Sequence, residues 1–480
     1  MAFQKIDISG GQVSGVSDLS SAPSSVINFD IDDAGANWPR PAMTTYTVTG
    51  ARSAAVTGMV TWGSHLIITY SDGYWQAVRN FAPTVAIDLS TSTATTQILG
   101  GERPTFVAAS DYVYAAAGHN IVRWASSLAA AETLSGSPRC THIASHGQYL
   151  IANDIENPDQ WVWSEIGEGS WTSFPAANTT TAASRPDAIV ALAESLTGVT
   201  VWGPESMQTY QLGSDPTLPF DLVSSLDLGL AAPYGFARGE TFWWMLDHHR
   251  RVVKCDGSTS ETISDAIQKD IAGLSDVSDC WMYRVVRGQF DQLVVRFPTA
   301  ERTFVLDLKA QRWREDRFYS APFQTDMPVG AYAKWTTSAF SYHMIGGDTS
   351  TGGTYRLDDT VRTEIGTTPI VCDRVTGWHD FGSMSRKRFG RVRAVLKRGA
   401  ATDPDVSDQG ALELRAQDDQ DPWSDWAQIN VGDATQFEPV VDVWDLAGVA
   451  ARRRYQMRYS SSEATAIAEL HQDFEEVGSP

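Results

Sequence analysis

One short segment type recurs along residues 51–360 at intervals close to 45 residues. It consists of an apolar run, a polar or glycine-containing turn, and a second run rich in aromatic or β-branched residues. Seven positions mark the recurrences, with spacings of 46, 36, 47, 45, 51 and 47 residues: Val60, Phe106, His142, Ile189, Tyr234, Val285 and Tyr332. A period of this length, with short paired strands in every unit, is typical of a four-stranded propeller blade.

Each unit continues into a further strand-like segment that ends in a polar turn. These segments cover residues 74–78, 121–124, 161–163, 207–210, 252–256, 304–308 and 355–358. The 17 Trp, 15 Tyr and 18 Phe also favour strands, because large rings suit a pleated, half-buried surface. We therefore predict an all-β fold, a β-propeller of six or seven blades. A β-sandwich with evenly spaced hairpins is the alternative interpretation of the same rhythm.

The pattern changes after residue 360. Residues 386–398, 412–416 and 452–459 alternate basic or polar side chains with apolar ones, as strands with one wet face do, and a Pro/Asp-rich turn covers 403–408. We expect three parts, which are an extended N-terminal arm over residues 1–50, the propeller over 51–360, and a C-terminal β-sandwich-like domain over 361–480. The arm either helps to close the propeller or reaches a neighbouring molecule.

The formal net charge of −21 argues against a protein that grips nucleic acid, since such binding depends on neutralising phosphates with Lys and Arg. An acidic wall would instead repel DNA that slides past it, although the charge is also explained by a need to stay dispersed. Cys140, Cys255, Cys280 and Cys372 show no metal-ligand spacing and predict synthesis in a reducing compartment. Without an apolar signal core or an 18-residue apolar stretch, we expect neither export nor membrane insertion.

The usual catalytic and nucleotide-binding motifs are absent. No G-x-x-x-x-G-K-[ST], G-x-G-x-x-G, G-x-S-x-G or H-E-x-x-H occurs. The His-His-Arg-Arg run at 248–251 is expected to be a polar hairpin turn, and the acidic run at 418–421 lacks the glycine and closing glutamate of a calcium loop. Residues 416–423 keep only the Asp and Trp of the sialidase repeat Ser-x-Asp-x-Gly-x-x-Trp. We therefore predict no enzyme, and no catalytic, cofactor-binding or metal-binding residue.

Several stretches resemble the tail-nozzle, or packaged-DNA-stabilisation, proteins of short-tailed phages. They are residues 187–192 (DAIVAL), 199–213 (VTVWGPESMQTYQLG), 228–243 (LGLAAPYGFARGETFW), 253–257 (VKCDG) and 263–271 (ISDAIQKDI), with weaker echoes at 28–41 and 448–455. The family's N-terminal segment tends to carry an Arg-x-Pro-Gly turn, whereas this chain has Trp-Pro-Arg-Pro-Ala at 38–42. That departure affects the local backbone of this turn.

The resemblance implies a structural virion protein of the phage tail, assembled in the host cytoplasm. It implies a homo-hexameric ring attached below the adaptor, the head-to-tail connector protein, with tail fibre or needle proteins as further partners. Double-stranded DNA would pass through the lumen without sequence-specific binding, and the ring would retain the packaged genome and conduct it during ejection. The resemblance implies no catalytic residue and no cofactor.

Basic residues gather in the C-terminal part of this otherwise acidic chain. We predict that they pair with acidic surfaces of adjacent copies or of the adaptor; intramolecular pairing is the alternative, because exposed ion pairs contribute little. The candidate inter-subunit contacts are Arg386, Lys387, Arg388, Arg391, Arg393, Arg452, Arg453 and Arg454. Two other classes of function stay open, a glycan-binding or glycan-hydrolysing tail propeller and a bacterial scaffold propeller without a virion role.

Overall fold

The computed structural model describes residues 2–14, 23–79, 85–89, 102–128, 130–167, 169–182, 187–215, 217–320, 323–348, 352–365, 368–398, 411–419, 421–430, 440–443, 446–460 and 465–477. The helical elements of these residues are one 3-10 turn, η1 (Asp265–Ile267), and one short helix, α1 (Gln268–Ala272). Neither is long and apolar enough to cross a membrane. The turn predicted at 403–408 lies outside the described residues.

Residues 56–262 form five consecutive antiparallel sheets of four strands, blades 1 to 5. Blade 1 contains β6 (Val56–Trp62), β7 (His65–Tyr70), β8 (Trp75–Arg79) and β9 (Val85–Asp88). Blade 2 contains β10 (Thr105–Ala108), β11 (Val113–Ala116), β13 (Val122–Trp124) and β14 (Glu132–Thr133), and β12 (His119–Asn120) pairs separately with β15 (Arg139–Cys140). Blade 3 contains β16 (Ile143–His146), β17 (Tyr149–Asn153), β18 (Gln160–Trp163) and β19 (Thr179–Thr181). Blade 4 contains β20 (Ala191–Glu194), β21 (Gly198–Trp202), β22 (Met207–Leu212) and β23 (Phe220–Leu226). Blade 5 contains β24 (Phe236–Arg238), β25 (Trp243–Leu246), β26 (Val252–Cys255) and β27 (Ser260–Thr262).

Two further blades follow, and each recruits strands from outside the repeat. Blade 6 contains β28 (Trp281–Arg287), β29 (Phe290–Phe297), β30 (Arg302–Asp307) and β31 (Arg312–Ser320), with β32 (Phe323–Asp326) paired to the end of β31. Blade 7 contains β33 (Val329–Thr336), β34 (Ser341–Gly347) and β35 (Thr354–Asp358), and its fourth strand is β5 (Ala42–Thr45) from the N-terminal segment. The short pair β36 (Thr363–Glu364) and β37 (Thr368–Pro369) comes next. The predicted all-β propeller is confirmed, with seven blades among the described residues.

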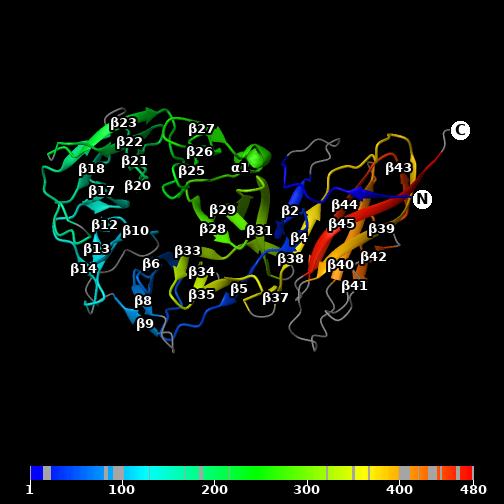
Figure 1. Ribbon diagram of the computed structural model, residues 1–480, viewed down its shortest axis with the longest axis horizontal. Helices are drawn as coiled ribbons and strands as arrows, with labels where there is room; N and C mark the ends of the chain where they lie inside the picture. Colours follow the sequence, from blue (N-terminus) through cyan, green and yellow to red (C-terminus); the bar gives the residue numbers. More distant parts are fainter. Residues whose placement is uncertain are drawn as a thin grey trace.

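Apolar clusters between neighbouring blades hold the propeller together. Strands such as β7 and β21 are buried along their whole length, since each blade packs against a neighbour on both faces. The seventh sheet also packs against the first: Trp335 of β33 is fully buried in a cluster with Val56 and Met59 of β6. Its indole N–H donates to the carbonyl of Ser64 at 3.2 Å. Figure 1 shows the blades following one another around a ring.

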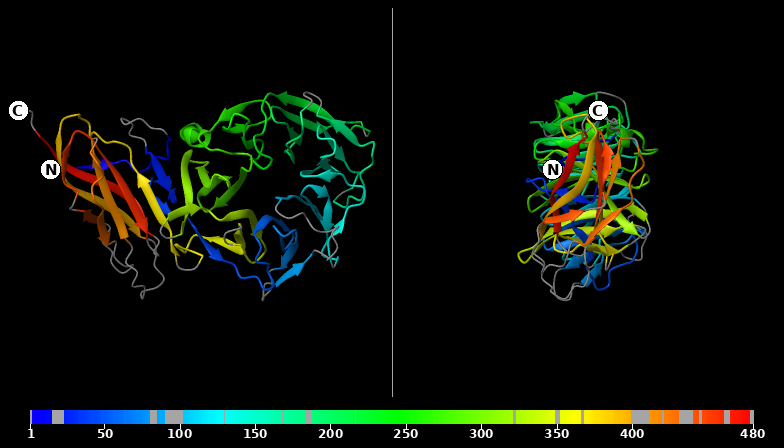
Figure 2. Two further views of the ribbon diagram at one scale, coloured as in Figure 1. Left: turned by 180° about the vertical axis from the view of Figure 1, so that it is seen from behind. Right: turned by 90° about the vertical axis from the view of Figure 1, so that its right-hand side faces the viewer.

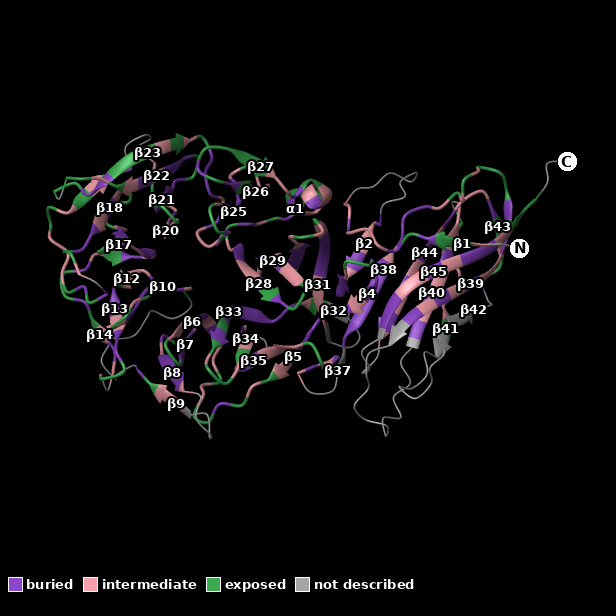
Figure 3. Cartoon of the chain, in the orientation of Figure 1, coloured by how far each residue is buried: buried purple, intermediate pink, exposed green. Residues whose placement is uncertain are grey.

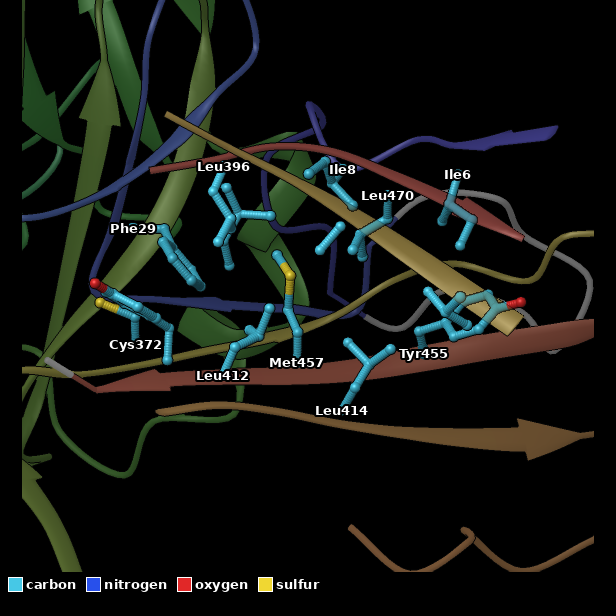
Figure 4. Packing of buried hydrophobic residues seen from close by; sticks show 14 of the residues in the cluster. Ile6, Ile8, Phe29, Cys372, Leu396, Leu412, Leu414, Tyr455, Met457 and Leu470 are labelled. Atoms are coloured by element: carbon cyan, nitrogen blue, oxygen red, sulfur yellow. The ribbon is translucent and has the colours of Figure 1, made fainter. Parts of the chain in front are cut away.

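The C-terminal domain is a sandwich of two sheets. One sheet contains β1 (Ala2–Ile6), β3 (Phe29–Ile31), β4 (Asn37–Pro39), β39 (Lys387–Arg398), β42 (Val440–Val443), β43 (Gly448–Ala450) and β45 (Thr465–Glu476). The other contains β2 (Ser25–Ile27), β38 (Val371–Val375), β40 (Ala411–Asp418), β41 (Ala427–Asn430) and β44 (Arg453–Ser460). Their facing side chains, among them Phe29, Leu414, Met457 and Leu470, form one buried core (Figure 4). The first fifty residues are therefore divided between this sandwich, through β1 to β4, and blade 7, through β5.

One continuous sheet joins the propeller to the sandwich. The outer strand of blade 6, β31, pairs in parallel with β2 at Glu315 and Ile27, and β2 pairs antiparallel with β38. Asn28, at a φ of 59°, fixes this junction: its amide group donates to the Val371 carbonyl at 2.8 Å and its side-chain oxygen accepts from the Arg317 backbone N–H at 2.7 Å. Asparagine is one of the few residues that adopt this backbone conformation readily.

A buried charge network lies beside the junction. Asp30 of β3 is 1% exposed, and its carboxylate contacts the guanidinium groups of Arg287 and Arg314 in blade 6 and the side-chain amide of Gln292. These contacts add directional restraints to the backbone pairing. Figures 1 and 2 show the result: the sandwich lies at one end of the long axis, and blades 3 and 4 lie at the opposite end.

Candidate interaction surfaces

The inner strands of blades 2 to 6 line a cavity of about 510 Å³ on the propeller axis. Its charged side chains are engaged with others: Glu194 lies 3.3 Å from Arg238 and 3.5 Å from His146, and Arg284 lies 2.6 Å from Asp291. Among the described lining residues Glu194 is the only carboxylate, whereas glycoside hydrolysis by the common mechanism requires two. The cavity has the size of a small-molecule site but does not present that pair.

A cluster of side chains spans the axis where the inner strands begin. The guanidinium group of Arg103, just before β10, lies 4.0 Å from the ring centre of Trp281 and donates to the Gly330 carbonyl at 2.8 Å. The imidazole of His142, just before β16, stacks on Tyr234 with ring centres 5.0 Å apart. These contacts join blades that are not neighbours, blade 2 with blades 6 and 7, and blade 3 with the segment that enters blade 5. Side chains therefore occupy the axis at this end.

The polar runs considered in the sequence analysis are built into turns. Residues 247–251 connect β25 to β26, where the buried Asp247 carboxylate accepts backbone N–H groups of His249 and Arg251 at 3.0 and 2.7 Å. Asp419 similarly accepts the backbone N–H groups of Ala451 and Arg452. Among the described residues no group of three or more His, Cys, Asp or Glu side chains could hold a metal ion.

The eight predicted contact residues occupy different settings in the sandwich. Arg386, just before β39, and Arg388, at its beginning, are exposed, and Arg388 lies opposite Val449 and Glu475 of the neighbouring strands. Arg391 and Arg393 are partly exposed, and both guanidinium groups lie over the ring of Phe3, at 5.6 and 4.3 Å from its centre. These four residues therefore remain at the surface.

Lys387 and Arg453 are buried within the domain. The Lys387 ammonium group donates to the carbonyls of Ser385 at 2.8 Å and Ala451 at 3.2 Å. The Arg453 guanidinium forms an ion pair with Asp418, at 2.7 Å between its Nη2 and the Oδ2 atom. Both cations hold loops of their own domain, and the strand alternation alone does not distinguish them from the exposed arginines.

Arg452 and Arg454 belong to a larger arrangement on the outer face of the second sheet, which we call the Trp–Arg ladder. Guanidinium groups alternate in it with indole rings in the order Arg452, Trp378, Arg454, Trp423, Arg415, Trp426 and Arg458. The distances from guanidinium carbon to ring centre run from 4.4 Å, for Arg415 and Trp426, to 5.1 Å, for Arg454 and Trp423. Each is within the range of a cation–π interaction.

Strand alternation and one turn build the ladder. In β44 every second side chain is buried, so Arg454 and Arg458 point outward together. The segment with Trp423 and Trp426 is held beside β40 by two hydrogen bonds between Ser424 and the Ala416 backbone, at 2.8 and 3.0 Å. The sequence analysis found Arg452 and Arg454 but missed the other members. The arginines at 452, 454 and 458 are separated by even numbers of residues, which places their side chains on the same face of a strand. This pattern could have indicated a basic face.

The four cysteines are free and buried. Burial raises the pKa of the Cys140, Cys255, Cys280 and Cys372 thiols, so the reactive thiolate is disfavoured at each of them.

Comparisons with known proteins bear mainly on the propeller. The family model described as bacteriophage P22 Gp10, β-propeller, matches residues 49–362. A search of the curated proteins finds no match.

Several solved structures match this chain at low identity. The extracellular domain of a putative one-component system from B. thetaiotaomicron has a TM-score of 0.44 and 10% identity over 75% of this chain; the match spans 43% of that chain, less than half its length. The N-terminal domain of Nup159 has a TM-score of 0.41 and 9% identity over 72% of this chain and 98% of its own. The computationally designed Ika8 protein has a TM-score of 0.36 and 10% identity over 66% of this chain and 99% of its own.

Proposed function

The chain belongs to the bacteriophage P22 Gp10 β-propeller family of phage structural proteins, and from this membership we propose that it forms the nozzle ring of a phage tail. The ring retains packaged DNA in the virion and conducts it during ejection. The observation that carries the proposal is the family match, which covers the propeller from residue 49 to residue 362, that is, all of its strands except β5. No step of this function requires a catalytic residue or a cofactor.

The propeller axis supports a passage that lies between copies rather than within one copy. The axial cavity has a volume of about 510 Å³, and the cluster around Arg103 and Trp281 spans it at one end. A double helix, whose major groove alone is about 12 Å wide, does not fit such a space. Several copies arranged around a common axis, six in the proposed homo-hexamer, would provide a lumen of sufficient width.

The charge of the chain suits a wall past which DNA moves. A net charge of −21 per copy makes the averaged surface repulsive to phosphate, so that DNA is confined without adhering. The continuous sheet from blade 6 into the sandwich supports the same role, because it couples the two domains through backbone hydrogen bonds. A passive conduit benefits from domains that hold their relative positions under load.

The partners of the ring follow from the same proposal. The adaptor protein above it and the tail fibre or needle proteins below it are its neighbours in the virion. The proposed contacts with acidic surfaces of these proteins or of adjacent copies involve basic side chains at the surface of the sandwich: Arg386 and Arg388, which are exposed, and Arg391 and Arg393, which are partly exposed. Lys387 and Arg453 support such contacts only indirectly, because they are buried.

A deletion of the gene tests the proposal. Particles assembled without the protein should leak their genomes and carry truncated tails in negative-stain images, and the protein supplied from a plasmid should restore both. Full retention of DNA with complete tails in its absence would contradict the proposal. The purified chain should also be silent on glycan arrays and in hydrolysis assays on host polysaccharide, which separates a nozzle from a glycan-processing propeller.

A further inference from the structure

The connections at one end of blades 2, 3 and 4 form a single surface. In an antiparallel blade the first and third connections lie at the same end, so the turn at 147–148 and the loop at 164–178 of blade 3 lie together. The Gly167 N–H donates to the Gln148 carbonyl at 2.9 Å. The equivalent connections cover 195–197 and 213–219 in blade 4, and the first turn of blade 2 covers 109–112. We call these five connections the hairpin face.

Close contacts join the hairpin face across the three blades. At Gly169 of blade 3 a Cβ atom would lie 2.5 Å from the Ser110 hydroxyl of blade 2, and at Gly147 it would lie 2.6 Å from a methyl group of Leu212 in blade 4. Both glycines also have positive φ angles, of 90° and 59°. Only glycine permits both the close approach and this backbone conformation without strain.

A groove runs along this face. One open hollow of about 490 Å³ is lined by Ser110, Ser145, Gly147 and their neighbours. A second hollow, of about 660 Å³, continues toward blade 1, and Ala109 and Ser110 line both. Small residues make up most of both linings, so the backbone of another chain can approach closely. The size and shape suit an extended segment rather than a folded domain.

Large apolar side chains are exposed beside the groove. Six of the ten exposed large hydrophobic residues in the described chain belong to blades 3 and 4: Ile166, Leu196, Leu212, Leu218, Leu222 and Val223. The first four lie in the hairpin face or at its border, and the last two continue it along β23, which Figure 3 shows mainly in the colour of exposed residues. Exposed apolar side chains gathered in this way mark an interaction surface.

The same connections carry carboxylates without a cationic partner. Asp111, Glu165 and Asp215 are exposed, and none of them forms an ion pair with a described residue. The Asp215 carboxylate accepts hydrogen bonds from the Thr217 hydroxyl and backbone N–H, at 2.7 and 2.8 Å, which leaves its charge in place. Residues 140–182 and 187–237 contain no Lys or Arg. The hairpin face is therefore acidic as well as apolar.

The cations around the hairpin face are engaged within the blades. Arg123 of β13 pairs with Glu132 at 2.8 Å, and Arg238 of β24 pairs with Glu194 at 3.3 Å. Arg79, at the blade 1 end of the groove, donates to the His65 ring at 2.9 Å. The carboxylates of Asp111, Glu165 and Asp215 thus complement cations that come from another molecule.

We propose that the hairpin face docks an extended segment of a partner protein in which apolar side chains are flanked by Lys or Arg. The apolar side chains would cover Ile166, Leu196 and Leu212, while the cations would meet the carboxylates around them. DNA is an unsuitable occupant, because its phosphates would be repelled. The surface exists whatever the role of the chain, but the expectation that the partner is another protein of the virion rests on the proposed ring.

Photo-cross-linking in assembled particles tests the docking. Chains with p-benzoylphenylalanine in place of Leu196 or Ile166 are supplied from a plasmid to particles that lack the gene. After irradiation each should join to a segment of another virion protein, and mass spectrometry should find apolar residues flanked by Lys or Arg in that segment. The same group in place of Asn157, exposed in the turn between β17 and β18 at the opposite end of blade 3, should not reach it. No cross-link at either position, or a cross-link only to this chain or to an acidic segment, would overturn the inference.

Peptide binding to the purified chain provides a second test. Fluorescent peptides of equal length with the repeats Lys-Leu-Ser, Glu-Leu-Ser and Lys-Ser-Ser are titrated by anisotropy, and the first should bind most tightly. Asp111→Lys/Glu165→Lys should weaken its binding about tenfold. The control Glu156→Lys/Glu301→Lys makes the same charge change at exposed turns of the opposite end and should leave binding unchanged. Equal binding of the two Lys peptides, or equal losses in the two variants, would mean attraction by net charge alone and would overturn the inference.

The two proposals fail in different ways. If loss of the gene releases the genome but neither cross-links nor selective peptide binding occur, only the docking inference is wrong. If the chain is absent from particles while the purified chain binds the Lys-Leu-Ser peptide selectively, the proposed ring is wrong and the docking surface stands.

Discussion

The outer strands of blades 6 and 4 occupy equivalent positions in the propeller but differ in their exposure to solvent. β31 of blade 6 is covered by β2, and its charged residues Arg314 and Glu315 are buried in ion pairs. β23 of blade 4 is open along its outer side and exposes Leu222 and Val223. A propeller leaves an outer edge on every blade, and this chain covers one of them with its own sandwich. The comparison teaches that equivalent outer strands of one propeller differ in exposure according to whether another part of the chain pairs with them.

The largest expected effect on stability comes from a substitution in the charge network beside the covered outer strand of blade 6. Asp30→Ala removes the buried carboxylate shared by Arg287 and Arg314, which are 6% and 5% exposed, and leaves each guanidinium group with one carboxylate partner, Asp359 and Asp316 respectively. We expect the free energy of unfolding to fall by about 3–5 kcal/mol, as in other broken buried ion pairs. Urea unfolding followed by tryptophan fluorescence measures the change.

The matched control for this change is Asp33→Ala. Asp33 pairs with Lys309 at the surface, with side-chain exposures of 60% and 58%. Loss of an exposed pair should change stability by less than about 1 kcal/mol. Equal losses for the two variants would show that the covered edge carries no special stability.

The second prediction concerns pH. Burial lowers the pKa of His142 to about 4, while its hydrogen bond to the Pro233 carbonyl opposes the shift. A histidine whose pKa is lowered in the folded state binds fewer protons there than in the unfolded chain. Its contribution to the free energy of unfolding is therefore complete above the unfolded pKa of about 6.5 and is lost as the pH falls toward 4. The full loss from this one residue is about 3 kcal/mol.

His142→Gln removes that titration and should flatten the stability profile between pH 6.5 and 4 relative to the parent chain. The Asp30 carboxylate should affect the free energy of unfolding in a separate pH range. Burial raises its pKa, but the attraction of Arg287 and Arg314 outweighs burial and the net pKa is lowered. Its contribution is therefore retained until the pH approaches about 4 and is lost below that value. A stability profile of His142→Gln that parallels the profile of the parent chain from pH 6.5 to 4 would contradict the assignment of this loss of stability to His142.

A smaller effect is expected from the ladder. Trp423→Ala removes the ring between Arg454 and Arg415, and two cation–π interactions at a partly exposed site contribute about 1–2 kcal/mol together. Trp423→Phe keeps an aromatic face and should lose less. Thermal unfolding of the three chains in parallel measures the order, and an alanine variant as stable as the parent would show that the ladder does not stabilise the sheet.

The smallest effect is expected at the open edge. Leu222→Ser and Val223→Thr lie on the exposed side of β23 and should change the free energy of unfolding by no more than about 0.5 kcal/mol. Their effect should appear in incorporation into particles instead. A large loss of stability would mean that this edge is part of the fold, which would remove the contrast with blade 6.

Much of the propeller was predictable from local pattern. The inner hairpins expected near Val60, Ile189 and Val285 are the strand pairs β6–β7, β20–β21 and β28–β29, and the expected outer segments coincide with the third strand of each blade. The fourth strands were not found, because segments such as β14 and β27 are too short and polar to show a period.

The interaction surfaces were only partly predictable. Alternation along 386–398 and 452–459 correctly indicated strands with one wet face, yet it does not tell an exposed arginine from one bonded inside the domain. Arg453 is buried because Asp418 lies beside it on the paired strand β40, and that pairing joins residues 35 positions apart. The Trp–Arg ladder likewise requires Trp378, Trp423 and β44 to be brought together from three segments.

The sequence by itself determined the repeating β units, their number to within one, and the acidic character of the chain, because these depend on neighbours within about 50 residues. Only the tertiary structure decided that β5 completes blade 7, that β1 to β4 enter the sandwich, and that β2 covers blade 6. Backbone N–H and C=O groups at a sheet edge accept any strand with the right geometry, so the choice of partner depends on which segment the rest of the fold brings there.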